Sequence, residues 1–252
     1  MTLVMNDKVL SKATTSPSKN PTPQKVKIDD KAATRSAILT FIEKSGVQVV
    51  TNSEWGAKIS KEVDFDWNYK SIAIHHSGNS FSCSADNYDQ LKRVEGKSPK
   101  QLTYHYAISC DGIVYELLDI RFKGAHIDKG NTGVIGIVML ADLSHPNEAE
   151  DQEYSKKGTI ERLKNYGSRL ADRWDTQYDT VSKIQEKALS TLISALKKYF
   201  AVNILGGHRE FQVLANKEGR ACPDAEGMKV VKNMRSLFSC TAPSSSNYPH
   251  KK

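Results

Sequence analysis

Three residues of the sequence have the types and the settings expected of a zinc site: His75, His208 and Cys222. His75 ends the apolar run IAIH, and His208 follows the segment ILGG. Cys222 lies in GRACPD, after an arginine and before a proline, a setting that favours the thiolate. Two imidazoles and one thiolate leave a tetrahedral zinc ion one open position for water, as in catalytic rather than structural sites. Spacing alone leaves open whether the three side chains converge.

Alternation along a strand decides which of two adjacent histidines is the better candidate ligand. Successive strand residues point to opposite faces, so His75 and His76 cannot enter the same site. Ile72 and Ile74 share a face with His76, whereas Ala73 shares one with His75. If the strand runs straight, alternation selects one of the two, and we predict that His75 rather than His76 is the inward partner.

An α/β pattern supplies the elements that must position these residues. Short segments rich in Ile, Val and Tyr predict strands over Ser71–His75, Tyr104–Ile108, Ile113–Leu117 and Val134–Leu140. Asp111-Gly112 predicts a hairpin between two of them. Apolar residues at helical spacing predict helices over 32–45, 189–200 and 228–238. Residues 142–182 are polar and predict a loop followed by a largely exposed helix.

The ends of the chain differ in composition from its middle. Residues 1–31 are rich in Ser, Thr, Pro and Lys and predict a disordered leader. Residues 32–46 then form a short helix or linker, 47–240 a zinc-binding domain, and 241–252 a disordered tail. The first ten residues lack the apolar core of a signal peptide, and no apolar run is long enough to span a bilayer.

The net charge of +7 does not indicate a nucleic-acid-binding protein. Most of the excess comes from lysines within residues 1–31 and at the last two positions. A nucleic-acid interface needs Lys and Arg clustered on a folded face, so we expect no such partner. The basic ends are either simply solvated or aid adhesion to anionic cell-wall polymers.

The other cysteines, Cys83, Cys110 and Cys240, form no CxxC pair. Nothing in a chain without a signal peptide favours disulfides over free thiols. We therefore expect these three to be free thiols, with pairing after export as the alternative.

Seven segments in order make the sequence similar to a known enzyme family. The chain resembles the peptidoglycan-recognition protein and phage-type amidase (amidase type 2) family in the segments TNSEWGA, IAIHHSG, TYHYAISCDGIVYE, GAHIDKGN, VIGIVML, GGHREF and ACPD. The resemblance implies a central mixed β-sheet flanked by helices, with a zinc cleft at one edge. It also implies Zn²⁺ as cofactor, held by His75, His208 and Cys222.

The resemblance implies roles for further residues. Tyr104 matches a tyrosine beside the zinc and is expected to stabilise the attacking water or the developing oxyanion. Arg220 stands where the family often has Lys or Thr; being always protonated, it is expected to stabilise the oxyanion without shuttling a proton. His126 and Asn131 match positions in the substrate groove and are expected to contact the peptide stem. The neighbour His105 faces the other way and is expected to be structural.

The general base stays unassigned. Glu116 matches a common family residue whose role is either structural or, less favoured, that of the base. ACPD replaces the usual CPG, and the segment between GGH and Cys222, interpreted as a loop, is longer than usual.

The activity that the resemblance implies is hydrolysis of the amide between N-acetylmuramic acid and L-alanine. Peptidoglycan muropeptide is then the substrate. A non-catalytic recognition module is the alternative, although such members typically lack the cysteine ligand. A structural protein in which the triad is accidental is a remote third reading. Synthesis in the cytoplasm without a signal peptide implies action at the cell wall or in the periplasm after secretion or lysis. An antibacterial effector, with an immunity protein and a secretion apparatus as partners, and a phage endolysin both fit.

Overall fold

The computed structural model describes residues 30–57, 64–78, 83–95, 104–146, 148 and 178–248. Their core is a six-stranded sheet in the order β1-β4-β3-β5-β2-β6. The strands are β1 (Val49–Val50), β2 (Ser71–His76), β3 (Tyr106–Ser109), β4 (Val114–Glu116), β5 (Val134–Leu140) and β6 (Ile204–Gly207). All neighbouring pairs are parallel except β3 and β4, so the predicted mixed sheet is confirmed.

Strands β2 and β5 lie inside the sheet and are buried along their whole length. Both are nearly continuous apolar runs, as expected for parallel strands covered on both faces. Their register pairs His75 with Val138 and His76 with Met139. Registered residues share a face, so β2 places its two histidines on opposite sides of the sheet, as predicted.

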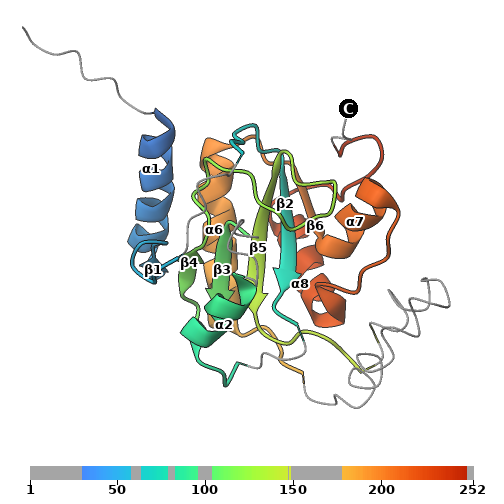
Figure 1. Cartoon of the computed structure of the whole chain (residues 1–252), viewed down its shortest axis with the longest axis horizontal. Helices are drawn as coiled ribbons and strands as arrows, with labels where there is room; N and C mark the ends of the chain where they lie inside the picture. Colours follow the sequence, from blue (N-terminus) through green and yellow to red (C-terminus); the bar gives the residue numbers. More distant parts are fainter. Residues whose placement is uncertain are drawn as a thin grey trace, which may run out of the picture.

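Helices cover both faces of the sheet (Figure 1). They are α1 (Asp30–Lys44), α2 (Asn87–Val94), α6 (Lys183–Tyr199), α7 (His208–Asn216) and α8 (Asp224–Leu237). One face, which carries Ile72 and Ile74, forms the main core with buried residues of α1, α6 and α8. On the opposite face, Val138 and Leu140 pack with Leu91 of α2.

Helix α7 was not predicted, because residues 209–221 had been interpreted as a loop. It buries only Phe211 and Gln212, so its apolar stripe is too narrow to show clearly in the sequence. Glu210 stabilises its start by accepting a hydrogen bond from the Gly207 backbone N–H at 2.9 Å. Helix α2 was not predicted either. The helices predicted over 32–45, 189–200 and 228–238 are present as α1, α6 and α8.

The predicted hairpin is confirmed at Asp111-Gly112. Gly112 has a φ of 80°, which glycine adopts without strain, and its N–H donates to the Ser109 carbonyl at 2.9 Å. Strand β3 begins only at Tyr106, two positions later than predicted, so Tyr104 lies in the segment that leads into the strand.

Helix α1 is part of the core. Ile38 and Ile42 are fully buried between this helix and the rest of the main core. Arg35 donates from Nε to Glu116 Oε1 at 2.6 Å, which ties α1 to β4. The packed unit therefore begins earlier than the predicted boundary at residue 47.

The packed unit also extends further at its C-terminal end, because residues 241–248, predicted as disordered tail, are packed. Thr241 forms a bridge with Ile204 of β6, and Tyr248 is buried against Phe211 with ring centroids 5.1 Å apart. The Tyr248 hydroxyl donates to the Gly130 carbonyl. The Thr241 bridge and the Tyr248 ring anchor this polar segment, through contacts that composition does not reveal.

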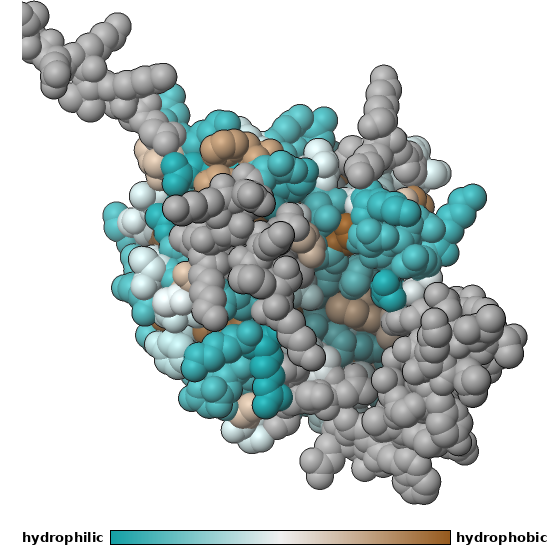
Figure 2. All heavy atoms as spheres, in the orientation of Figure 1, coloured by the Kyte–Doolittle hydropathy of each residue, from teal (hydrophilic) through white to brown (hydrophobic). Residues whose placement is uncertain are grey.

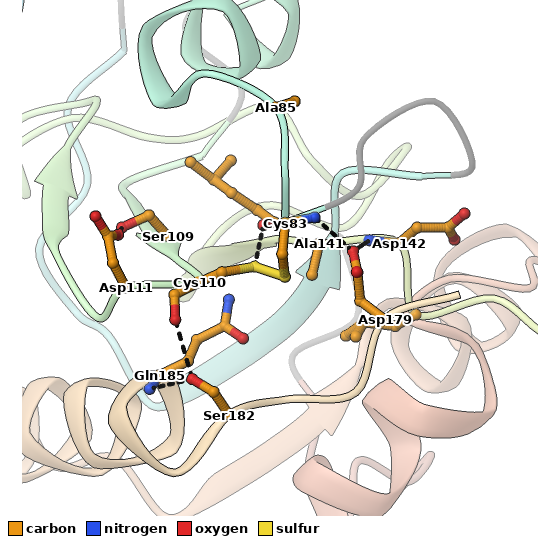
Figure 3. The surroundings of a disulfide bond; sticks show 12 residues. Cys83, Ala85, Ser109, Cys110, Asp111, Ala141, Asp142, Asp179, Ser182 and Gln185 are labelled. Carbon is orange, nitrogen blue, oxygen red and sulfur yellow. Dashed lines mark hydrogen bonds between the residues drawn. A yellow bond between two sulfur atoms is a disulfide. The ribbon is translucent and has the colours of Figure 1, made fainter. Parts of the chain in front are cut away.

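The expectation of free thiols was wrong for Cys83 and Cys110, which form a disulfide (Figure 3). Cys110 follows β3, and Cys83 precedes α2; their Cα atoms lie 5.5 Å apart. Asp179 accepts a hydrogen bond from the Cys83 N–H at 2.8 Å and Ser182 donates to the Cys110 carbonyl at 3.0 Å. Cys240, like Cys222, is a free thiol, as expected.

The face seen in Figure 1 is mostly hydrophilic over the described residues, with exposed apolar side chains in small separate areas (Figure 2). Within the described ranges, no helix has the length and apolar character needed to cross a membrane. The predicted leader up to residue 29 and most of the predicted helix within 142–182 lie outside those ranges.

Candidate metal centre

His75 and His208 are brought together by the parallel pairing of β2 and β6. Ile74 pairs with Gly207 in the last register pair of these strands, so His75 of β2 and His208 at the start of α7 lie side by side at the carboxyl end of β6. Their ring centroids are 4.5 Å apart. Carboxyl ends of adjacent parallel strands are where α/β sheets gather functional groups, and this topology gives the convergence that spacing could not.

Cys222 is held beside these rings by contacts to the start of α7. The Arg209 N–H, in the first turn of that helix, donates to the Cys222 carbonyl at 2.8 Å. Gly207 allows the approach, because a Cβ there would lie 2.6 Å from Pro223 Cδ. The Cys222 Sγ consequently lies 3.7 Å from His75 Nδ1.

These three side chains fit a zinc ion. One ligand atom from each of His75, His208 and Cys222 lies within 4.8 Å of the other two. Zn–N and Zn–S bonds of about 2.0 and 2.3 Å at tetrahedral angles require an N···S separation of about 3.6 Å, close to the 3.7 Å between His75 Nδ1 and Cys222 Sγ. His75 is fully buried, whereas His208 and Cys222 are half-buried, so the donor set is reachable from solvent.

The electrostatic environment keeps His75 neutral. Burial, and then the neighbouring imidazoles of His208, His126 and His76, lower the pKa of His75 well below its usual value. A metal ligand must offer a lone pair, so this shift favours coordination.

Each metal-facing histidine has a hydrogen-bond partner on its other nitrogen. His75 Nε2 lies 3.1 Å from His126 Nδ1, and His208 Nε2 lies 3.0 Å from Gln212 Oε1. Gln212 was not identified from the sequence, although it stands four positions after His208 and therefore on the same side of α7.

Tyr104 lies next to the candidate ligands. Its ring centroid is 4.8 Å from that of His75. Burial, followed by the nearby Cys222, raises the pKa of Tyr104. The phenol therefore stays protonated at neutral pH and is available as a hydrogen-bond donor.

Arg220 lies two residues before Cys222 and pairs with Glu218, with Nη2 and Oε2 3.2 Å apart. The Glu218 side chain is 55% exposed, so this pair is at the surface. An oxyanion-stabilising role for Arg220 stays a prediction.

The predicted substrate-binding residues His126 and Asn131 have structural partners. His126 is buried, and its ring lies over Gly136 of β5, where a Cβ would be only 2.6 Å from the ring. Asn131 Oδ1 accepts hydrogen bonds from the backbone N–H groups of His126 and Ile127, both at 2.8 Å. Asn131 thus shapes the loop that carries His126, and a direct contact of either residue with a peptide stem stays a prediction.

His105 is structural, as expected. Its Nδ1 accepts from the Gly136 N–H at 3.0 Å and its Nε2 lies 2.9 Å from the Phe122 carbonyl oxygen. Glu116 is likewise a structural residue, because its fully buried carboxylate is paired with Arg35 and accepts from the Asn52 N–H at 3.3 Å. These contacts argue against Glu116 as the general base.

Comparison with known proteins supports this fold and identifies the family. Residues 65–225, more than half of the chain, match the N-acetylmuramoyl-L-alanine amidase family, and the chain belongs to that family. All three candidate ligands lie within the matched range.

Individual relatives are more distant. Peptidoglycan-recognition protein SC2 of Drosophila simulans is 32% identical over 122 residues, which cover 46% of this chain and 66% of the relative. The structure of Drosophila PGRP-LB superposes with a TM-score of 0.52 at 19% identity, over 77% of this chain and 96% of that one. A variant of Drosophila PGRP-LB in complex with tracheal cytotoxin gives a TM-score of 0.50 at 19% identity, with the same coverage. At these identities the superpositions establish a shared fold.

Proposed function

We propose that this protein is a zinc-dependent peptidoglycan amidase that hydrolyses the bond between the lactyl group of N-acetylmuramic acid and L-alanine. The observation that carries the proposal is the convergence of His75, His208 and Cys222, with ligand atoms within 4.8 Å of one another, inside the range that matches the amidase family. The complex of a PGRP-LB variant with tracheal cytotoxin supports a muropeptide as the ligand class.

Each residue of the site has its own role in the proposed reaction. His75, His208 and Cys222 would hold the zinc ion, which in such a site supplies Lewis acidity toward a carbonyl and lowers the pKa of a bound water. Tyr104, protonated and adjacent to His75, donates a hydrogen bond to the oxygen on which negative charge develops. Arg220 supplies a positive charge to the same oxygen, in addition to the charge of the zinc ion.

Digestion of purified sacculi tests the proposed activity. We expect intact glycan strands and free stem peptides beginning with L-alanine, identified by mass spectrometry. A chelator and Cys222→Ser should both abolish release, and zinc should restore only the chelated wild type. Cuts within the peptide or the glycan would contradict the amidase assignment.

A recognition module is the second candidate, because the curated relative is named as a recognition protein. Wild-type protein that binds muropeptide but contains no zinc and releases no peptide would favour it. The Cys222 thiol beside His75 and His208 favours the enzyme, since these three side chains together offer a ligand set that suits zinc.

We also propose that the protein acts outside the cytoplasm, at the cell wall, as an antibacterial effector or an endolysin. The Cys83–Cys110 disulfide supports this, since disulfides persist in oxidising compartments. Expression directed to the bacterial periplasm should lyse cells, whereas cytoplasmic expression should not. Protection by the product of an adjacent gene would indicate an effector with an immunity protein.

A further inference from the structure

The two metal-facing histidines make the same kind of contact on the side away from the metal position. His75 Nε2 lies 3.1 Å from His126 Nδ1, and His208 Nε2 lies 3.0 Å from Gln212 Oε1. The atom that donates in each contact determines which nitrogen of each ring can offer a lone pair to a metal.

In the contact between His75 and His126, a backbone carbonyl group identifies which ring donates the hydrogen bond. His126 Nε2 lies 3.3 Å from the Val134 carbonyl oxygen, which can only accept a hydrogen bond. His126 must therefore carry its proton on Nε2, which leaves Nδ1 as an acceptor. His75 consequently donates from Nε2, and its Nδ1 lone pair faces Cys222 Sγ at 3.7 Å.

In the second contact, the donor can be identified because Gln212 also contacts Asp128, in the loop that carries His126. The amide of Gln212 makes two bonds to Asp128: its Nε2 donates to the Asp128 carbonyl at 3.2 Å, and its Oε1 accepts from the Asp128 N–H at 3.0 Å. This pair fixes the orientation of the amide. His208 must then donate from Nε2 to Gln212 Oε1, so its Nδ1 is also left without a proton.

Both acceptors are built into the fold. His126 is buried and its ring occupies the space that the missing side chain of Gly136 leaves, since a Cβ there would lie 2.6 Å from the ring. Gln212 is only 1% exposed. The loop between them is shaped by Asn131, which accepts the His126 N–H at 2.8 Å.

We propose that His126 and Gln212 are positioning residues that select the Nε2–H tautomers of His75 and His208 and thereby direct both Nδ1 atoms at the zinc. The inference rests on the proposed function only in that zinc is the metal. It gives His126 a role in supporting a ligand, beside the contact with a peptide stem, which stays a prediction. Partners of this kind typically change metal affinity about 10- to 100-fold.

Metal affinity of the full-length protein tests the proposal without an activity assay. The metal-free protein is titrated with Zn²⁺ in competition with a chromophoric chelator. His126→Phe keeps a ring over Gly136 but removes the acceptor, and should weaken zinc binding about 10- to 100-fold. His126→Asn places Oδ1 near the position of Nδ1 and should recover most of that loss. Gln212→Leu and Gln212→Glu form the corresponding pair for His208.

His145→Phe is the matched control, because His145 pairs with Glu226 at 2.9 Å and should leave the affinity unchanged. Equal affinities for wild type, His126→Phe and Gln212→Leu would overturn this inference while leaving the zinc enzyme intact. A wild type that takes up no zinc would instead overturn the proposed function.

A second measurement does not depend on the variants folding. Long-range ¹H–¹⁵N correlation spectra of the wild type distinguish the two imidazole tautomers in the presence and absence of Zn²⁺. We expect Nε2–H for His75, His126 and His208 in both states. A proton on Nδ1 of His75 or His208 in the metal-free protein would overturn the proposal.

Discussion

His76 and Asp224 join the sheet to the loop that carries Cys222, with His76 Nε2 2.6 Å from Asp224 Oδ2. Both side chains are almost fully buried, on the face of the sheet opposite His75. Asp224 has a φ of 62°, a conformation that favours glycine. The pair gives a physical reason for an aspartate at a strained position: its carboxylate fastens the Cys222 turn to β2.

Substitutions at Asp224 should separate the backbone effect from the side-chain contact. Asp224→Asn keeps an acceptor for His76 and tolerates the positive φ, so its free energy of unfolding should fall least. Asp224→Ala loses the contact and stays strained, and should lose about 3 kcal/mol or more. Asp224→Gly should recover about 1 kcal/mol of that. Urea unfolding measures all three. Equal free energies of unfolding for Asp224→Asn and Asp224→Ala would contradict a stabilising contact between His76 and Asp224.

Tyr104→Phe should separate catalysis from metal binding. Loss of one donor to the developing oxyanion typically lowers kcat about 10²- to 10³-fold. The three candidate ligands, His75, His208 and Cys222, are unchanged in this variant, so its zinc content after purification should equal that of the wild type. A variant that keeps wild-type kcat would remove Tyr104 from the proposed chemistry.

His105 predicts a pH dependence of stability. Burial, only partly offset by the hydrogen bond to the Phe122 carbonyl, lowers the pKa of His105 to about 4. The unfolded chain, with a usual value of about 6.5, binds the proton more readily. His105 therefore contributes stability that is complete above about pH 6.5 and is lost as pH falls toward 4, a few kcal/mol in total.

His105→Gln isolates that contribution, because Gln keeps a donor for the Phe122 carbonyl but does not titrate. The difference in unfolding free energy between wild type and variant, followed from pH 7 to pH 4, should shrink with decreasing pH. A constant difference would show that His105 is not the titrating group.

The Cys83–Cys110 disulfide should stabilise the fold against denaturant. The bond spans a sequence separation of 27 residues, and closing a loop of that length restricts the unfolded chain by about 3–4 kcal/mol. Reductant should lower the unfolding midpoint of the wild type and leave that of Cys83→Ser/Cys110→Ser unchanged. Thiol counting on the oxidised native protein should find two free cysteines, Cys222 and Cys240.

The contact between Arg35 and Glu116 predicts that α1 is needed for stability. Glu116 is fully buried, so Arg35→Met leaves its carboxylate without a counter-charge and should cost about 3 kcal/mol. Adding Glu116→Gln removes the charge and should recover part of this loss. Purely additive effects in the double variant would mean that the two residues act independently.

Several features of the site could be predicted from local sequence. Four of these features depend on neighbouring residues alone: the strand ending at His75, the alternation that turns His76 to the other face, the Asp111-Gly112 hairpin and the thiol in GRACPD. Periodicity and turn chemistry are local properties, and these predictions held where the structure describes them. Helices α2 and α7 were not predicted, and α7 buries only Phe211 and Gln212, which gives no readable period.

Tertiary structure decided everything that depends on contact between distant segments. Parallel pairing of β2 with β6 brought His208 to His75, and the Gln212–Asp128 contact set the orientation of the amide that His208 meets. The partner of Cys83 and the anchoring of Tyr248 were likewise settled by packing. The sequence determined which groups could bind a metal, because ligand chemistry belongs to residue types. Only the fold decided which nitrogen of each histidine faces the metal position, because the hydrogen-bond partner of the other ring nitrogen selects the tautomer.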